Sequence, residues 1–187
     1  MEENQQSSKE MTALNDDNSD ITLRLMDLSD IDDFMVWATD EKVSKFCTWK
    51  TCTSKEEALA YMIKSVIPHP WMRAICLNNR AIGYILLTEF EGNDACRCEV
   101  GYVLASKYWG KGIATRALKM VTSTVFRERT HLKRLDAWAD IENVGSHRVL
   151  VKAGFQKEGV LRKYMLIKEK PRDMVVFSLL STDPKVN

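Results

Sequence analysis

The stretch that decides the fold is Tyr108-Trp109-Gly110-Lys111-Gly112-Ile113-Ala114-Thr115. It follows a strand-like segment and opens an amphipathic helix, with two glycines in the turn between them. Glycine lets the backbone approach an anion without a Cβ in the way. The unpaired N–H groups of a helix start point toward such a ligand, with the positive end of the dipole behind them. We therefore expect the backbone of this stretch to bind a ligand that carries a diphosphate.

Two better-known glycine loops do not fit this stretch. A Walker loop requires Ser or Thr directly after Gly-Lys, and Gly112 stands there instead. A dinucleotide fingerprint requires a third glycine where Thr115 stands, and the preceding segment is not the first strand of a βαβ unit. The stretch therefore belongs to a different class of phosphate-binding loop.

Residues 109–114 resemble the acyl-CoA pyrophosphate loop of the GNAT N-acetyltransferase superfamily, Gln/Arg-x-x-Gly-x-Gly/Ala, with Trp109 in place of the first Gln or Arg. The longer run from Glu99 to Thr115 is similar to the Rim-type branch, named for ribosomal-protein N-terminal acetyltransferases, in which Trp before Gly-Lys-Gly is common. The second signature of that branch follows in the same order, as Asn143-x-x-Ser146, Lys152-Ala153-Gly154-Phe155 and Arg172-Asp173. The resemblance covers residues 21–180.

The resemblance implies an α/β fold of the GNAT type, a mixed central sheet flanked by helices, and acetyl-CoA as co-substrate without a metal. It places the oxyanion contact on a backbone N–H of the strand before the glycine loop, within residues 100–104. The donor-binding residues that it implies are Val100, Tyr102, Val103, Trp109, Gly110, Lys111, Gly112, Ile113, Ala114, Thr115 and Asn143. Asn143 is also a natural helix cap, and the two roles are compatible.

Acetyl transfer to an amine requires a base for the amine and a proton donor for the departing thiolate. Glu99 begins the strand before the glycine loop, where several members of the superfamily place a carboxylate base. Its alternatives are a solvated glutamate without a catalytic role, a water chain, or another carboxylate among Glu89, Glu91 and Asp140. Ser146 matches the serine that lies near the CoA sulfur in the Rim-type pattern and acts as general acid. Its alternative is a first-turn helix residue that bonds backbone groups.

Other side chains are candidates on weaker grounds. The cations available to the phosphates are Lys111, Arg116, Arg148 and Lys152, although exposed cations are common without a ligand. The aromatics available to line the acceptor cleft are Trp37, Trp49, Trp71 and Tyr164, although core packing explains such residues more often. His147 is expected on the surface, because adjacent helix residues point in different directions.

The composition limits the class of protein. With 187 residues, a formal net charge of +1 and no basic cluster, we expect one domain and no direct nucleic-acid partner. No apolar run reaches the length of a membrane span, and the N-terminus lacks the apolar core of a signal peptide. We expect a cytoplasmic protein, with nuclear access open to it, that is a monomer or a weak dimer. The five cysteines lack Cys-x-x-Cys spacing and nearby histidines, so neither a zinc site nor a disulfide framework is expected.

The organisation along the chain follows from polarity and periodicity. Residues 1–20 are polar and expected to be disordered, and one domain is expected over residues 21–182. Strands are expected at 21–25, 71–77, 81–90, 97–105, 134–139, 155–168 and 173–180. Helices are expected after a Ser29 cap, after the capping box Ser54–Glu57, from residue 113, and at 146–153 before Gly154.

We interpret the chain as an acetyl-CoA-dependent N-acetyltransferase that acetylates a primary amine. The acceptor stays open between a protein N-terminal amine and a small amine such as a polyamine or an amino acid. A non-catalytic acyl-CoA-binding module is the alternative from a different class, and acetyl-CoA turnover against panels of amines distinguishes the two.

Overall fold

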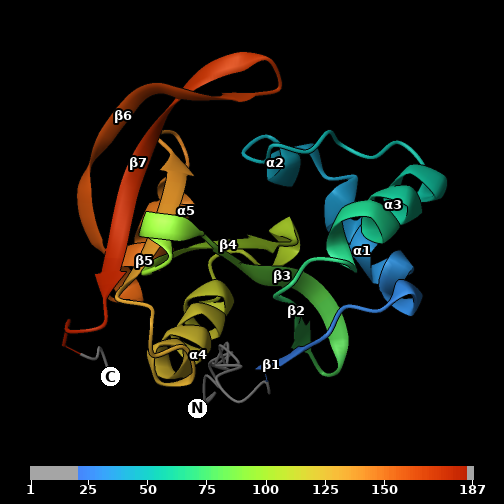
Figure 1. The fold of residues 1–187 in the computed structure, drawn as a ribbon. Helices are drawn as coiled ribbons and strands as arrows, with labels where there is room; N and C mark the ends of the chain where they lie inside the picture. Colours follow the sequence, from blue (N-terminus) through green and yellow to red (C-terminus); the bar gives the residue numbers. More distant parts are fainter. Residues whose placement is uncertain (1–20, 185–187) are drawn as a thin grey trace, which may run out of the picture.

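The computed structural model describes residues 21–184, and the disorder predicted for residues 1–20 lies outside this range. Its strands form one seven-stranded sheet in the order β1-β2-β3-β4-β5-β7-β6 (Figure 1). The strands are β1 (Ile21–Arg24), β2 (Met72–Leu77), β3 (Arg80–Glu89), β4 (Arg97–Leu104), β5 (Arg134–Asp140), β6 (Gln156–Ile167) and β7 (Lys170–Leu180). All neighbours are antiparallel except the parallel pair β4–β5, so the predicted mixed sheet is confirmed.

Helices cover both faces of the sheet (Figure 1). They are α1 (Ile31–Ala38), α2 (Glu41–Ser44), α3 (Lys55–Tyr61), α4 (Ile113–Glu128) and α5 (Val144–Lys152). Short helical turns are η1 (Leu28–Asp30), η2 (Met62–Val66), η3 (Gly92–Asp94) and η4 (Ser106–Tyr108). Each face buries its own apolar cluster, one with α4 and α5 and one with α1 to α3. Because side chains alternate along a strand, β4 gives Val100 to the first cluster and Val103 to the second.

The predicted end of α5 at Gly154 is confirmed in detail. Gly154 has a φ of 96°, a left-handed conformation that glycine adopts without a Cβ penalty. The N–H groups of Gly154 and Phe155 donate to the C=O groups of Val151 at 3.1 Å and Leu150 at 3.0 Å. These two bonds are the Schellman pattern, which satisfies the last carbonyls of the helix and turns the chain into β6.

The N-terminal caps are predicted correctly for α3 but not for α1. Ser54 Oγ accepts the Glu57 N–H at 3.2 Å, the first bond of the predicted capping box, whereas the Glu57 carboxylate accepts the Thr53 N–H at 2.8 Å and not that of Ser54. The expected cap at Ser29 is wrong. Instead the Asp27 carboxylate accepts the Ser29 N–H at 2.8 Å, and the Asp30 carboxylate accepts the Asp27 N–H at 2.9 Å. These bonds form η1, a short turn ahead of α1, because aspartate reaches its own backbone neighbours readily.

Strands β4 and β5 pair only at their N-terminal ends. The paired residues are Arg97 with Arg134, Cys98 with Leu135, and Glu99 with Asp136. Beyond these pairs β4 stays bonded to β3 through Leu104, while β5 continues toward β7. Within the described residues, the β4 edge over 100–104 that faces β5 therefore has no strand partner. Apart from the Leu104 C=O, which accepts the Trp109 indole N–H, the backbone N–H and C=O groups of this edge are available to a ligand.

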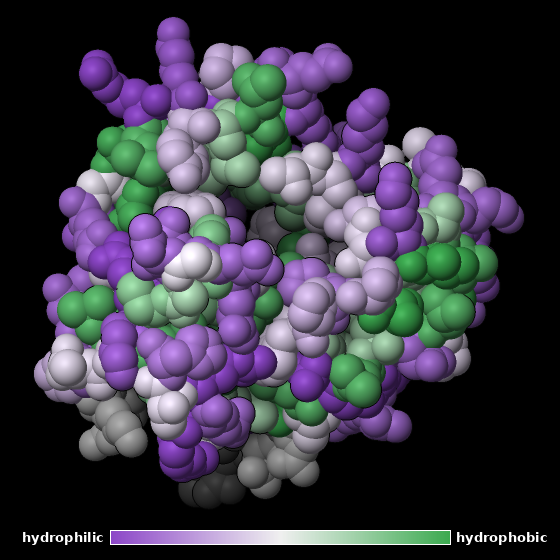
Figure 2. Space-filling view, viewed as in Figure 1, coloured by the Kyte–Doolittle hydropathy of each residue, from purple (hydrophilic) through white to green (hydrophobic). Residues whose placement is uncertain are grey.

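The β6–β7 hairpin extends past the rest of the sheet and curves toward α2 (Figure 1). At its tip, Lys168 Nζ donates to Ser44 Oγ at 3.0 Å and to Thr51 Oγ1 at 3.2 Å. Ser44 is fully buried, so the tip is anchored on the α2 segment. Figure 2 shows a hollow at the centre of this face, between the hairpin and the layer of α1 to α3.

Candidate active site

The glycine stretch forms the turn between η4 and α4. Gly110 and Gly112 have φ values of 78° and 74°, and a Cβ at either position would meet no atom within 4 Å. The positive φ values explain why glycine stands at both positions, and the open space leaves the backbone accessible. The N–H groups of residues 113–115 lie in the first turn of α4, where no intrahelical acceptor exists for them. Together with the helix dipole they form a site for an anion.

Trp109 holds the glycine loop against the end of β4. Its indole N–H donates to the Leu104 C=O at 2.7 Å, and its side chain is 45 % exposed. The bond accounts structurally for a tryptophan at this position. Three further residues of the predicted donor site, Val100, Val103 and Ile113, are buried in the core, so they offer a ligand only their backbone.

Glu99 lies where β4 and β5 begin to diverge. Its side chain is half-buried, and within the described residues no hydrogen bond or ion pair engages its carboxylate. Burial raises the pKa of Glu99, and the Asp136 carboxylate beside it raises it further. Asp136 is itself held by Arg97 at 3.2 Å and by Arg134 at 2.6 Å. An unpaired carboxylate with a raised pKa is the state expected of a general base.

Two of the alternative carboxylates are engaged elsewhere. Glu89, which pairs with Cys98 at the end of β3, bonds Arg129 at 2.6 Å. Asp140 is 2 % exposed and accepts two bonds from Arg172, at 2.6 and 2.9 Å. Burial raises the pKa of Asp140, but the Arg172 guanidinium and the Glu142 N–H lower it, so that the net pKa lies below its usual value. Among these three, Glu99 is the carboxylate left available as a base.

Ser146 is joined to Tyr102 across the gap between β4 and α5. The Tyr102 hydroxyl lies 2.6 Å from Ser146 Oγ and 3.2 Å from the Ser146 C=O. Burial raises the pKa of Tyr102, so its hydroxyl keeps its proton. The sequence identified Ser146 as a proton donor and placed Tyr102 only among the donor-binding residues. The missed signal was strand alternation, which places Tyr102 on the α4 and α5 face, opposite to Glu99.

The β5–α5 connection positions Ser146. Asn143 Oδ1 accepts the Ser146 N–H at 3.1 Å, so Asn143 caps α5 as predicted. The Glu142 N–H donates to Asp140 Oδ1 at 2.8 Å, which ties this connection to the Arg172 ion pair. The sequence predicted a surface position for His147, but its side chain does not lie free on the surface. It is half-buried, with Nε2 3.0 Å from the Asp140 C=O and its ring 5.6 Å from that of Phe177.

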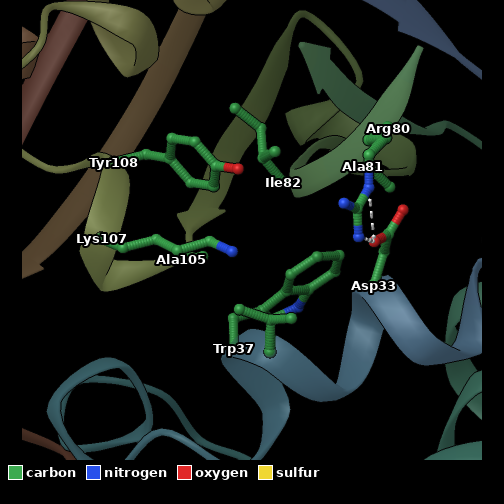
Figure 3. A pocket seen from close by; sticks show the side chains of 9 residues that line it. Asp33, Trp37, Arg80, Ala81, Ile82, Ala105, Lys107 and Tyr108 are labelled. Carbon is green, nitrogen blue, oxygen red and sulfur yellow. Dashed lines mark hydrogen bonds and ion pairs between the residues drawn. The ribbon is translucent and has the colours of Figure 1, made fainter. Parts of the chain in front are cut away.

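Trp37 is a core residue. Its side chain is 0 % exposed, and it borders a cavity of about 10 Å³ with Tyr108 and the Arg80–Asp33 ion pair (Figure 3). Such a volume holds about one water molecule. Figure 3 shows Tyr108 and Lys107 extending toward this cavity from the segment before the glycine loop. The cavity is therefore a packing feature beside the loop and too small for an acceptor.

The other three candidate aromatics lie in different environments. Trp49 packs on Tyr61, with ring centroids 6.3 Å apart. Trp71 lies near the Arg73 guanidinium, 4.9 Å from its ring centroid. Tyr164 is 46 % exposed, and its ring centroid lies 5.6 Å from that of Trp138. The sequence did not single out Trp138, although its alternation with Asp136 along β5 places both on one face.

The candidate cations Lys111, Arg116, Arg148 and Lys152 are all exposed. Lys111 Nζ lies 5.8 Å from the Tyr108 ring centroid. Over residues 21–184, no helix is long and apolar enough to cross a membrane.

A family model described as the acetyltransferase (GNAT) domain matches residues 20–156, and the chain belongs to this family. The diverging β4 and β5, the glycine loop at the start of α4 and the mixed sheet agree with that membership. The chain is an N-acetyltransferase, as the sequence predicted.

The chain is similar to several known proteins. Uncharacterized N-acetyltransferase p20 of Bacillus licheniformis is 29 % identical over 169 residues, covering 87 % of this chain and 94 % of that protein. The ribosomal protein uS5-alanine N-acetyltransferase of Escherichia coli (strain K12) is 34 % identical over 87 residues, 46 % of this chain and 44 % of the enzyme. Mycobacterium smegmatis RimJ, solved in complex with CoA-disulfide, superposes with a TM-score of 0.73 at 24 % identity, covering 86 % of this chain and 82 % of RimJ. The predicted likeness to Rim-type proteins is confirmed.

Proposed function

We propose that this N-acetyltransferase uses acetyl-CoA as donor and a protein N-terminal amine as acceptor. Glu99 acts as general base and Ser146, bonded to Tyr102, as proton donor to the leaving thiolate. The observation that carries the proposal is the position of Glu99. Its unpaired, half-buried carboxylate lies where β4 and β5 diverge, on the strand that leads into the glycine loop.

The residues around the gap fit a CoA-type donor. The open, left-handed glycines at 110 and 112 leave room for a diphosphate against the start of α4. The β4 edge over 100–104 offers N–H and C=O groups to the amides of an extended arm that enters between the strands. The CoA-disulfide complex of the similar RimJ protein supports the same class of donor.

Each residue of the site has a separate task in the transfer. An acetyl thioester supplies an acyl group that is already activated. Glu99 accepts a proton from the acceptor amine, and its raised pKa brings its basicity closer to neutral pH. A backbone N–H of the β4 edge donates to the carbonyl oxygen as negative charge develops there. Ser146 Oγ gives a proton to sulfur and regains one from solvent, while Glu99 returns the amine proton to solvent, so one proton leaves the amine and one reaches the thiol.

The two faces of β4 separate these tasks. Glu99 lies on the face of α1 to α3, whereas Tyr102 reaches α5 on the opposite face. The acceptor therefore approaches the gap from one side while the thiol is protonated from the other. The name of the similar Escherichia coli enzyme, an alanine N-acetyltransferase of a ribosomal protein, favours an N-terminal amine as acceptor.

Two measurements test the proposal. Acetyl-CoA and CoA should raise the melting temperature by binding the folded state, with NAD and ATP doing so weakly. Gly112→Asp should abolish this shift, because it places a side chain and a negative charge against the diphosphate. Thiol release should then follow the addition of peptides with free N-termini. Equal shifts with ATP would contradict the donor, and a blank across peptides and small amines, despite CoA binding, would indicate a binding module.

A further inference from the structure

A groove of about 490 Å³ lies on the open face of the C-terminal half of the sheet. Its volume falls within the range of about 300–1,000 Å³ that small-ligand sites occupy. It is lined by one residue of β4, three of β5, four of β6 and one of β7, which are Arg97, Arg134, Asp136, Trp138, Glu158, Gly159, Leu161, Tyr164 and Val176. Core residues of the same strands, such as Leu135 and Phe177, face α4 and α5 instead.

The charged side chains of the groove are paired with one another. Arg134 bonds the Glu158 carboxylate at 2.6 and 2.8 Å and Asp136 at 2.6 Å. Arg97 bonds Asp136 at 3.2 Å, and Ser178 Oγ donates to Glu158 at 2.6 Å. The two arginines and two carboxylates thus neutralise each other. Neither carboxylate that lines the groove, Asp136 or Glu158, is left unpaired for the ammonium groups of a polyamine.

The remaining lining is apolar and open to solvent. Leu161 is 37 % and Tyr164 46 % exposed, and the Tyr164 and Trp138 rings are 5.6 Å apart. Val176 of β7 lies beside them. An uncharged side chain placed on these groups would bury apolar surface without removing any charge from its partner.

The groove is continuous with the proposed catalytic carboxylate. Arg97 stands two residues before Glu99 on the same face of β4, and Asp136 is the register partner of Glu99 on β5. Trp138 lies two residues further along β5, about 7 Å from Asp136 at the rise of an extended strand. An extended peptide whose amine is at Glu99 therefore places the side chain of its second or third residue at Trp138 and Tyr164.

We propose that this groove is the acceptor subsite for an uncharged, apolar side chain one or two residues after the reacting amine. The preferred acceptor is then a peptide α-amine with an apolar second or third residue, not a polyamine. The inference rests on the proposed function and adds to it the class of acceptor sequence.

The test uses the full chain and tetrapeptides that share their first and last residues. The second and third residues are Gly, Leu, Phe, Asp or Lys, and spermidine is included. We expect kcat/KM for peptides with Leu or Phe at these positions to exceed that for the peptide with Gly at both by about ten-fold or more, because KM is lower. Tyr164→Ala should remove most of this preference, and Tyr164→Phe, the matched control, should keep it. The preference is the ratio of kcat/KM for an apolar peptide to kcat/KM for the glycine peptide, both measured with the same variant. A general loss of activity lowers both values equally and leaves this ratio unchanged.

The outcomes separate this inference from the proposed function. The subsite would be refuted if all peptides had the same KM whatever their second and third residues, or if the preference survived in Tyr164→Ala. Either outcome would leave the proposed function standing. Spermidine as a better substrate than every peptide would overturn the acceptor class. A Tyr164→Ala protein that changes its oligomeric state on size exclusion, with unchanged KM, would assign the groove to a second copy of the chain. No acetylation of any amine would instead refute the proposed function.

Discussion

Replacement of Tyr102 and Ser146, singly and together, tests the hydroxyl pair at the gap. The two oxygens lie 2.6 Å apart in a half-buried position. Such a bond contributes about 0.5–1.5 kcal/mol net, and an unpaired buried hydroxyl costs about 1–3 kcal/mol. Tyr102→Phe and Ser146→Ala should each lower the free energy of unfolding by about 1–2 kcal/mol. The double variant should lose about 1 kcal/mol less than the sum, because both changes remove one bond.

The same pair has a kinetic consequence. If Tyr102 only orients Ser146, its loss costs about 1 kcal/mol, which is about five-fold in kcat. Ser146→Ala removes the proton donor itself and should lower kcat by about 10²-fold or more. CoA affinity should change little in either variant, since the proton is transferred in the transition state.

The assay is thiol release with a saturating peptide acceptor, beside urea unfolding and calorimetric CoA binding. A thioester whose leaving thiol has a low pKa should need less protonation, so the deficit of Ser146→Ala should shrink with it. An unchanged kcat in Ser146→Ala would refute the assignment. A larger loss in Tyr102→Phe than in Ser146→Ala would assign the proton to Tyr102 instead.

Three further predictions concern the base, the glycine loop and the hairpin. Glu99→Gln should lower the rate about 10²-fold at neutral pH, less at high pH. The pKa of Glu99 is raised in the folded state, so the ionised carboxylate destabilises the fold at pH values above that pKa. The melting temperature of Glu99→Gln should therefore exceed that of the unmodified protein at neutral pH, and the two should be equal in acid. Gly112→Ala should lower the free energy of unfolding by about 1–2 kcal/mol, because Gly112 has a φ of 74°. Urea unfolding measures this loss, and the control Gly145→Ala, within a helix, should leave the free energy of unfolding unchanged or raise it. Lys168→Met removes the bonds to Ser44 and Thr51, so it should speed hydrogen exchange at the hairpin tip without changing CoA affinity. The control Lys170→Met should leave hydrogen exchange at the tip unchanged. Equal exchange in both variants would contradict the anchor.

Local signals predicted the parts of the fold that local chemistry decides. The strands expected at 71–77 and 81–90 are joined by a short turn in which Asn78 and Asn79 have φ values of 49° and 63°, a conformation that asparagine tolerates. The stop at Gly154 and the glycines of the phosphate loop follow the same reasoning, since each fixes a backbone conformation within a few residues.

The start of β7 was predicted too late because its turn uses residues that rarely form one. Lys168 and Glu169 have φ values of 50° and 65°, so β7 begins at Lys170 and not at 173. Pro171, which has no N–H to donate to a neighbouring strand, lies inside β7. It is tolerated because β5 pairs with β7 only from Met174 onward, which leaves no strand on that side to accept a Pro171 N–H.

Whether a carboxylate is free to act as the proposed base depends on contacts that no local pattern contains. Glu89, Glu99 and Asp140 are all acidic residues in or at the end of a strand, and in the sequence only the family resemblance ranks Glu99 before the other two. Glu89 receives Arg129 from 40 residues away, and Asp140 receives Arg172 from 32 residues away. Glu99 receives no cation within the described residues and has Asp136 as its neighbour instead, so its pKa is raised. Arg129 and Arg172 therefore engage two of the candidate carboxylates, while the β4–β5 register sets Asp136 beside Glu99, which leaves Glu99 as the proposed base.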